Sequence, residues 1–393
     1  FTLKYASHFF FGSASAMVLL LLPFFALFFV SLSSAARVDL FRHHKPDSID
    51  FKPDLLSLLN KYAAISRRHF NRTGEHLNIV NFDDINLQKR ASAHSNLHSD
   101  RSWSGQIEVG FPPQKTLTLF DTGSSDLVLD KAAYNPKWSL SSKNLHKQFD
   151  FSYGSQHVAG DLYTDKVAIG GVKASNVPIG HGNGDFNNGN GGTFGLSFSN
   201  SENSGFDVQQ LPFTWAAKKQ HLIQSSTYQF TLRPTGKATL NVGRVDLFEL
   251  AGPITWSDKN SDHTFWRITT ELNGNKIENA IADTGTNFIG GPPDQVKALL
   301  DNLDGVSVEL AEDGSYEGFY SCQNPPHLSF KVLGQTFTFP EPAMNFGFID
   351  DKCRLAIFGT PGMQDWILGS PFFETASVIL NYDVRRMGFA KYR

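Results

Sequence analysis

Two stretches of the chain, each with apolar residues spaced two apart, end at an aspartate. Leucines alternate with threonines over residues 116–119 before Asp121, and Ile277 and Ile281 lie on one side of the segment before Asp283. A period of two predicts a β-strand with one buried face. Each aspartate is followed by Thr-Gly, and glycine allows the backbone to turn sharply. The sequence therefore predicts two similar strand–turn units, each holding a carboxylate where its strand ends.

Most other apolar patterns in the chain also favour strands. Helical spacing is found only in segments 54–62, 209–220 and 292–303. The glycine-rich segment 180–192 lacks the Gly-Lys-Ser/Thr ending of a phosphate-binding loop, so we expect a surface loop there. The remaining expected strands cover residues 103–109, a hairpin over 149–169, 265–269, 276–282, a hairpin over 328–340, 366–373 and 376–390. These patterns predict an all-β protein with a few short helices.

The repeated Asp-Thr-Gly is the strongest candidate for chemistry. If the two turns meet across a pseudo-twofold axis, Asp121 and Asp283 would lie within hydrogen-bonding distance. Two carboxylates that close share one proton, so one can take a proton from water while the other donates to a carbonyl oxygen. Such a dyad adds water to an amide without a metal or a covalent nucleophile. The residues expected to support it are Thr122, Gly123, Ser124, Thr284, Gly285 and Thr286.

With these two signatures and four further motifs, the chain resembles the pepsin-like aspartic peptidases, and the secreted fungal pepsin-type enzymes in particular. The resemblance runs from about Trp103 to Arg393. Residues 151–155 resemble the family's flap, a hairpin that closes over the substrate, with Tyr153, Gly154 and Ser155 at its tip. The other three motifs are Phe194-Gly-Leu196, Trp366-Ile-Leu-Gly369 and Met387-Gly-Phe-Ala390.

The resemblance implies two pseudo-twofold-related, β-barrel-like lobes and a secreted aspartic endopeptidase made as a zymogen. It also implies peptide and protein substrates, a preference for bulky hydrophobic residues at the cut, and no cofactor. Three features depart from the family pattern: Val128 replaces a tryptophan that bonds the flap tyrosine, Ser370 replaces an aspartate, and the small N-lobe disulfide loop is absent. Because Val128 cannot donate a hydrogen bond, an inactive binding or inhibitor protein on the same scaffold stays open as the alternative.

The chain divides into four predicted segments. Residues 1–36 contain an apolar run after Met17, the expected initiator, and are interpreted as a secretory signal cleaved near Ala36; a signal anchor is the alternative. Residues 37–90 would be a pro-segment that ends at the dibasic pair Lys89-Arg90, with Arg67-Arg68 as a competing pair. Residues 91–250 and 251–393 would be the two catalytic lobes. We expect secretion, with a vacuolar location as the alternative.

Charge and cysteines add three expectations. The net charge of −3 divides into +1 over residues 1–36, +3 over residues 37–90 and −7 from residue 91 onward. The basic leader, residues 37–90, could therefore dock on the acidic body by electrostatic attraction; solvated surface charge is the alternative. In the family a pro-segment lysine can lie between the aspartates, and Lys61 resembles it. The two cysteines, Cys322 and Cys353, are expected to form a disulfide rather than two free thiols. We expect a monomer without metal or nucleic acid.

Overall fold

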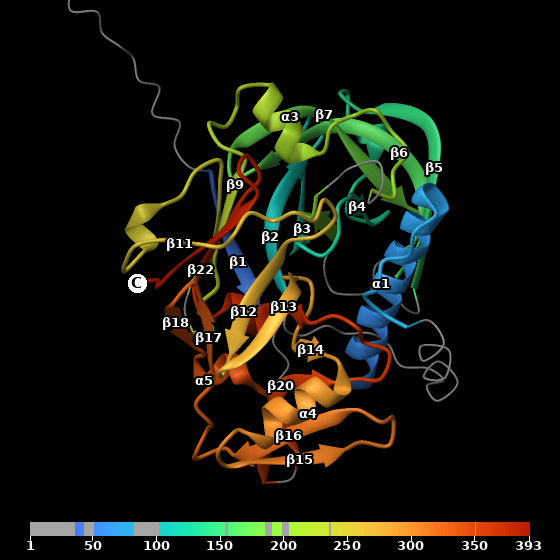
Figure 1. The fold of residues 1–393 in the computed structure, drawn as a ribbon. Helices are drawn as coiled ribbons and strands as arrows, with labels where there is room; N and C mark the ends of the chain where they lie inside the picture. Colours follow the sequence, from blue (N-terminus) through green and yellow to red (C-terminus); the bar gives the residue numbers. More distant parts are fainter. Residues whose placement is uncertain are drawn as a thin grey trace, which may run out of the picture. The chain divides into compact units, whose positions relative to one another are not determined.

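Two β-sheets contain most of the chain in the computed structural model, which describes residues 36–42, 51–81, 102–153, 156–184, 191–198, 204–235, 237–349 and 351–393 (Figure 1). Strand order in the larger sheet is β11 (Thr255–Trp256), β23 (Arg386–Ala390), β22 (Ser377–Asn381), β9 (Thr227–Thr231), β10 (Ala238–Val242), β1 (Ala36–Arg42), β2 (Trp103–Val109), β3 (Gln114–Asp121), β8 (Gly192–Gly195), β4 (Leu127–Leu129), β7 (Val172–Gly182), β6 (Gln156–Ile169) and β5 (Lys143–Tyr153). Strand order in the smaller sheet is β15 (Val306–Leu310), β16 (Tyr316–Ser321), β20 (Lys352–Gly359), β14 (Ile289–Gly291), β21 (Ile367–Leu368), β13 (Asn275–Ala282), β12 (Arg267–Leu272), β17 (Ser329–Val332) and β18 (Gln335–Thr338), with β19 (Asn345–Ile349) beside β20.

The same strand arrangement occurs twice. In the N-terminal lobe, β3 runs parallel to β8, β8 is antiparallel to β4, and β4 is parallel to β7. The C-terminal lobe repeats these three relations: β13 runs parallel to β21, β21 is antiparallel to β14, and β14 is parallel to β20. Each aspartate comes at the end of the first strand of its set. This internal repeat confirms the predicted all-β, two-lobe pepsin-type fold.

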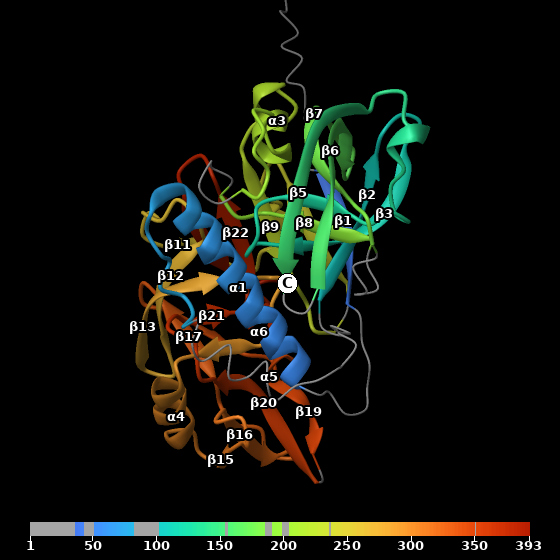
Figure 2. The ribbon, with the colours of Figure 1, turned by 90° about the vertical axis from the view of Figure 1, so that its right-hand side faces the viewer.

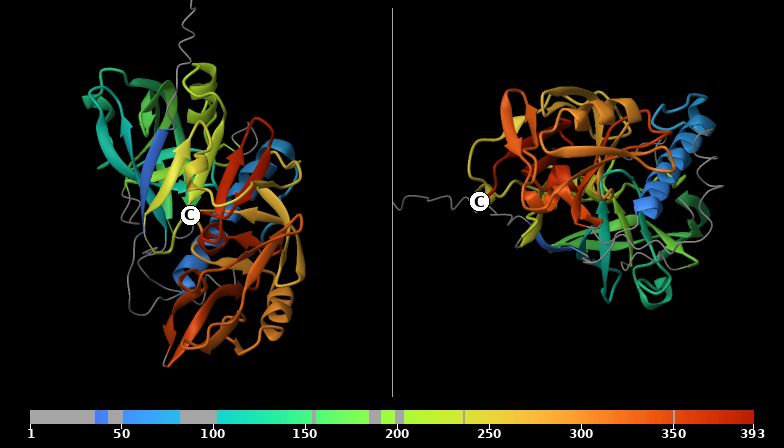
Figure 3. Two further views of the ribbon diagram at one scale, coloured as in Figure 1. Left: turned by 90° about the vertical axis from the view of Figure 1, so that its left-hand side faces the viewer. Right: turned by 90° about the horizontal axis from the view of Figure 1, so that it is seen from below.

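The two lobes are joined through the larger sheet. The last strands of the chain, β22 and β23, follow residue 251, yet β22 pairs with β9 of the N-terminal lobe (Figure 3). The expected lobe boundary near residue 250 therefore separates two segments of sequence but not two separate sheets. The two lobes therefore share one continuous sheet.

Strand β1 covers Ala36 and the first residues of the predicted pro-segment 37–90, the leader, and it was not predicted as a strand. It lies between β10 and β2, and Val38 pairs with Leu240 while Leu40 pairs with Gly105. Its ends form ion pairs with buried carboxylates: Arg37 lies 3.4 Å from Glu249, and Arg42 lies 3.4 Å from Glu374. The leader thus contributes a central strand to the sheet of the body.

Two expected elements differ in extent or type. The helices are α1 (Phe51–Thr73), α3 (Phe213–Lys219), α4 (Pro293–Asp301), α5 (Glu341–Met344) and α6 (Ser370–Phe373), with single 3₁₀ turns η1 (Pro136–Trp138) and η2 (Leu247–Glu249). The helix expected over 209–220 begins only at Phe213, because Pro212 occupies its N-cap position. The strand expected over 366–373 ends at Leu368, and α6 begins at Ser370 with Pro371 in its first turn.

Helix α1 is much longer than the predicted segment 54–62 and packs across the body (Figure 2). Its apolar face, which includes Leu55, Leu58 and Leu59, lies in one core cluster with C-lobe side chains such as Phe288 and Phe358. On the N-lobe side, Arg72 donates a hydrogen bond to the carbonyl oxygen of Ser204. Within the described residues, no helix is long and apolar enough to cross a bilayer.

The predicted disulfide between Cys322 and Cys353 is present and closes a loop with a sequence separation of 31. Replacing both cysteines by serine is expected to lower the free energy of unfolding by about 3 kcal/mol, because the open loop gains conformational freedom in the unfolded chain. Urea unfolding of parent and variant would measure this. A reductant should shift the midpoint of the parent only; an equal shift in the variant would contradict the explanation.

Candidate active site

The two strand–turn units place Asp121 and Asp283 against each other. Asp121 is the last residue of β3, and Asp283 follows β13 directly. Both carboxylates are buried. Each accepts the same pair of hydrogen bonds from its own turn. In both turns, the amide of the glycine two residues after the aspartate donates to the carboxylate at 2.9 Å. The hydroxyl of the residue three positions after the aspartate also donates, at 2.5 Å from Ser124 and at 2.7 Å from Thr286.

Hydrogen bonds of Thr122 and Thr284 join the two turns. The backbone amide of Thr122 donates to Oγ1 of Thr284 at 3.0 Å, and the amide of Thr284 donates to Oγ1 of Thr122 at 2.9 Å. Each hydroxyl then donates across the interface to a strand carbonyl, that of Ala282 at 2.8 Å or that of Phe120 at 2.6 Å. Because every buried donor finds an acceptor in the opposite lobe, this network fixes the spacing of the two carboxylates.

Glycine is required in both turns because each carboxylate lies against the opposite turn. A β-carbon on Gly123 would come within 2.5 Å of Cγ of Asp283. A β-carbon on Gly285 would come within 2.3 Å of Oδ1 of Asp121. No side chain fits at these distances, so the glycines serve the close approach of the two aspartates as well as the turn.

Lys61 of α1 lies between the two aspartates. Its ammonium donates to Oδ1 of Asp121 at 2.8 Å and to Oδ1 and Oδ2 of Asp283 at 3.1 and 3.0 Å. The hydroxyl of Tyr62, the next residue, donates to Oδ2 of Asp283 at 3.0 Å. The resemblance covered the pair Lys61-Tyr62 but assigned a role to Lys61 alone. An ammonium in this position excludes a water molecule held by both carboxylates.

The two buried aspartates beside Lys61 have different pKa values. Burial raises the pKa of Asp121 to about 6, with the charge of Asp283 adding to the rise and Lys61 opposing it. Burial also acts on Asp283, but Lys61 and the hydrogen bonds to its carboxylate outweigh it and lower the pKa to about 2. Burial alone would lower the pKa of Lys61, yet the attraction of both carboxylates raises it overall. One aspartate therefore holds its proton more readily than the other.

Several predicted residues lie outside the described structure or are only partly described. Tyr153 ends β5, and the hairpin of β5 and β6 pairs it with Gln156. Gly154 and Ser155, at the tip, and the processing pair Lys89-Arg90 lie outside the described residues. The hairpin is thus present where the flap was expected, while these residues' roles stay predictions.

Of the three departures from the family pattern, the two substituted residues are both accommodated by packing. Val128 is buried in an apolar cluster with Phe149, Val158, Leu162 and Phe206, near the base of the hairpin. Ser370 is fully buried, and its amide donates to the carbonyl oxygen of Thr286 at 2.7 Å. Neither residue disturbs the hydrogen bonds around the aspartates.

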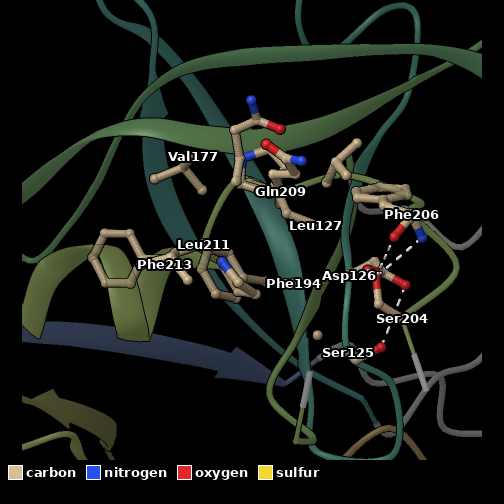
Figure 4. A pocket seen from close by; sticks show the side chains of 15 residues that line it. Ser125, Asp126, Leu127, Val177, Phe194, Ser204, Phe206, Gln209, Leu211 and Phe213 are labelled. Carbon is tan, nitrogen blue, oxygen red and sulfur yellow. Dashed lines mark hydrogen bonds between the residues drawn. The ribbon is translucent and has the colours of Figure 1, made fainter. Parts of the chain in front are cut away.

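A buried carboxylate that the sequence did not reveal lies just beyond the first turn. Asp126 accepts hydrogen bonds from the hydroxyls of Ser204 and Ser125 (Figure 4). It also accepts one from the amide of Gly205. Burial raises its pKa, and its hydrogen bonds and the charge of Arg68 on α1 oppose the rise. It borders a cavity of about 200 Å³ whose lining includes neither Asp121 nor Asp283. Asp126 anchors segment 204–206 beside the first turn.

The site and the fold together define a pepsin-type protein, and comparison with known proteins gives its family. Residues 102–392 match the sequence model described as eukaryotic aspartyl protease, so the chain belongs to that family. It is similar to secreted aspartyl protease 1 of Malassezia globosa, with 33% identity over 88% of this chain and 89% of the relative. It is also similar to pepsin A of Suncus murinus, with 24% identity over 75% and 81%. The protein is therefore a peptide hydrolase.

A further relative bears on the alternative function. The chain is 29% identical, over 74% of its length and 78% of the relative, to a Malassezia globosa protein named "Probable inactive secreted aspartyl protease". The hydrolase family thus includes a relative whose name marks it as inactive, so the active state of a member depends on the residues of its site.

Proposed function

We propose that the protein is a secreted aspartic endopeptidase, made as a zymogen, in which Asp121 and Asp283 activate water. The observation that carries this proposal is the symmetrical burial of the two carboxylates, each with one amide and one hydroxyl donor from its own turn. Its relatives named as secreted proteases support an extracellular location.

The chemistry follows from a dyad that carries one proton. The ionised carboxylate takes a proton from water, whose oxygen attacks the carbonyl carbon of the peptide, while the other carboxyl protonates the carbonyl oxygen. In the resulting gem-diol, one carboxyl donates its proton to the amide nitrogen as the C–N bond breaks, and the other carboxylate takes the proton of a gem-diol hydroxyl, which becomes the carbonyl of the acid. The products are a carboxylic acid and an amine, and the dyad regains its single proton. The donors of Ser124 and Thr286 hold the outer oxygens throughout.

We assign residues 37–90 as a pro-segment that blocks this chemistry. Lys61 and Tyr62 occupy the hydrogen-bonding positions of the dyad, and the apolar face of α1 covers the adjoining C-lobe surface. After α1, the leader stays bound to the body, since Val80 pairs with Met363 and the amide of Asn81 donates to Gly362 at 2.7 Å. Cleavage at Lys89-Arg90 and loss of this segment would open the dyad to substrate.

The surface beneath α1 supports the proposed preference for bulky hydrophobic residues. Three aromatic rings, those of Phe288, Phe346 and Phe358, pack edge to face at centroid distances of 5.0 to 6.2 Å. Leucines of α1 belong to the same apolar cluster. A substrate side chain that replaces a leucine there would recover similar apolar contact, worth roughly 2 kcal/mol.

Acid digestion tests the proposed function. The processed protein should cleave an unfolded protein at pH 4 and lose this activity at neutral pH, because both carboxylates are then ionised and none donates. A peptide whose scissile amide is replaced by a secondary alcohol should inhibit it, since the alcohol resembles the gem-diol. Binding of that peptide without any cleavage of substrates would favour the inactive binding protein instead.

A further inference from the structure

Two loops at the edge of the N-terminal lobe expose large apolar side chains next to each other. Phe111, in the turn between β2 and β3, is 53% exposed, while Trp138 and Leu140, in and after η1, are 71% and 84% exposed. The two loops touch, because the amide of Leu140 donates to the carbonyl oxygen of Phe111 at 2.7 Å and the amide of Phe111 donates to Oγ of Ser139 at 3.0 Å. We call these three side chains the loop patch.

Hydrogen bonds hold the two loops that carry the loop patch in a fixed position. Gln114 and Asn135 exchange two hydrogen bonds between the loops, at 3.0 and 2.8 Å. Beneath them, the buried carboxylate of Asp165 accepts from the hydroxyls of Tyr134 at 2.7 Å and Ser141 at 2.6 Å. These bonds fix the backbone so that the apolar side chains point away from the core, although their burial would be favourable.

The surroundings of the loop patch are cationic, in contrast to the acidic body. Between residues 110 and 149 the sequence has five lysines and three acidic residues, and all three acids are buried aspartates. Lys166 adds another cation directly at the patch, with its ammonium 5.1 Å from the centre of the Phe111 ring. The exposed lysines within the two loops and beside them in the sequence are Lys115, Lys131, Lys137 and Lys143; Lys115 pairs with Glu108 at 3.9 Å.

We propose that the loop patch docks the protein on an anionic lipid surface. Aromatic and aliphatic side chains on rigid loops enter the headgroup region of a bilayer, and lysines around them are attracted by anionic lipid headgroups. A protein partner would be expected to supply acidic groups and a complementary shape, whereas a bilayer needs only the combination of exposed apolar tips and positive charge seen here. The teal loops lie apart from α1 in both side views, so docking leaves the dyad side free (Figures 2 and 3).

Vesicle binding tests this proposal on the secreted protein. Sedimentation with vesicles of phosphatidylcholine plus phosphatidylserine should retain the protein, whereas vesicles of phosphatidylcholine alone should retain much less, and about 1 M salt should release it. Trp138→Ser should weaken the partition about tenfold, and Lys137→Gln about fivefold. Cleavage of a soluble peptide should stay unchanged in both variants, which shows that they fold.

Phe248→Ser provides a matched control. Phe248 is an 86% exposed aromatic residue, but its neighbours Asp246 and Glu249 are acidic. Its replacement should leave vesicle binding unchanged. Equal binding to both vesicle types, an equal loss in Phe248→Ser, or full binding by Trp138→Ser would overturn the proposal. So would a concentration-dependent dimer in sedimentation velocity that Trp138→Ser abolishes, because the loop patch would then bind a second copy.

Discussion

Replacing Asp121 by asparagine is expected to reduce peptide hydrolysis at acid pH by about 10³-fold or more, the size of a lost general acid–base step. The amide can neither take the proton of the attacking water nor share a proton with Asp283. Its NH₂ group also replaces one of the two carboxylate oxygens, which accept from the amide of Gly123 and from the hydroxyl of Ser124. The turnover number of the processed protein on a soluble peptide measures this loss.

Two readouts separate this catalytic effect from damage to the fold. Asp258→Asn, at an exposed position of the C-terminal lobe, changes the same functional group and should retain full turnover. Asp121→Asn should still bind a peptide whose scissile amide is replaced by a secondary alcohol, although more weakly. Turnover within tenfold of the parent in Asp121→Asn would exclude the proposed dyad.

Asp121→Asn should also change how the stability of the precursor depends on pH. Because burial raises the pKa of Asp121 to about 6 from an ordinary value of 3.8, the folded precursor prefers this group protonated. Its contribution to stability is present below pH 3.8 and is lost as the pH rises through about 6, a change of roughly 3 kcal/mol. Since asparagine does not titrate, the melting temperature of Asp121→Asn should fall less between pH 4 and pH 7 than that of the parent.

The sequence predicted the dyad because its chemistry is local and repeated. Each Asp-Thr-Gly carries its own amide and hydroxyl donors within three residues, so the carboxylate environment can be inferred before the fold is known. The meeting of the two turns required the pseudo-twofold axis, which the resemblance supplied. Thr122 and Thr284 then donate across that axis as their matching positions suggested.

The leader shows why other features escaped prediction. Strand β1 has a clear alternation, with Ala36, Val38 and Leu40 buried, but it lies next to the apolar segment interpreted as a signal. Its pairing with β10 and β2 joins residues far apart in the sequence, and no local pattern encodes such partners. Asp126 was missed for the same reason, since its partner Ser204 lies 78 positions away.

Replacing Lys61 by methionine is expected to loosen the leader at neutral pH by about 3 kcal/mol or more, because two buried carboxylates lose their shared counter-ion. Hydrogen exchange of the α1 amides in the purified precursor should then accelerate by about 10²-fold. The deficit should shrink as the pH falls, because without Lys61 the pKa of Asp121 lies above its value of about 6 in the parent and the pair takes up a proton more readily.

Arg67→Met is the matched control, since it removes one positive charge from an exposed position of the same helix. Arg67 is not among the residues that bond to the two aspartates, so exchange in α1 should accelerate far less than in Lys61→Met. If both variants loosened equally, the basic leader would be held by general attraction to the acidic body. Equal protection in Lys61→Met and the parent would instead mean that the apolar face of α1 holds the helix, and the ion pairs with the aspartates would only block the dyad.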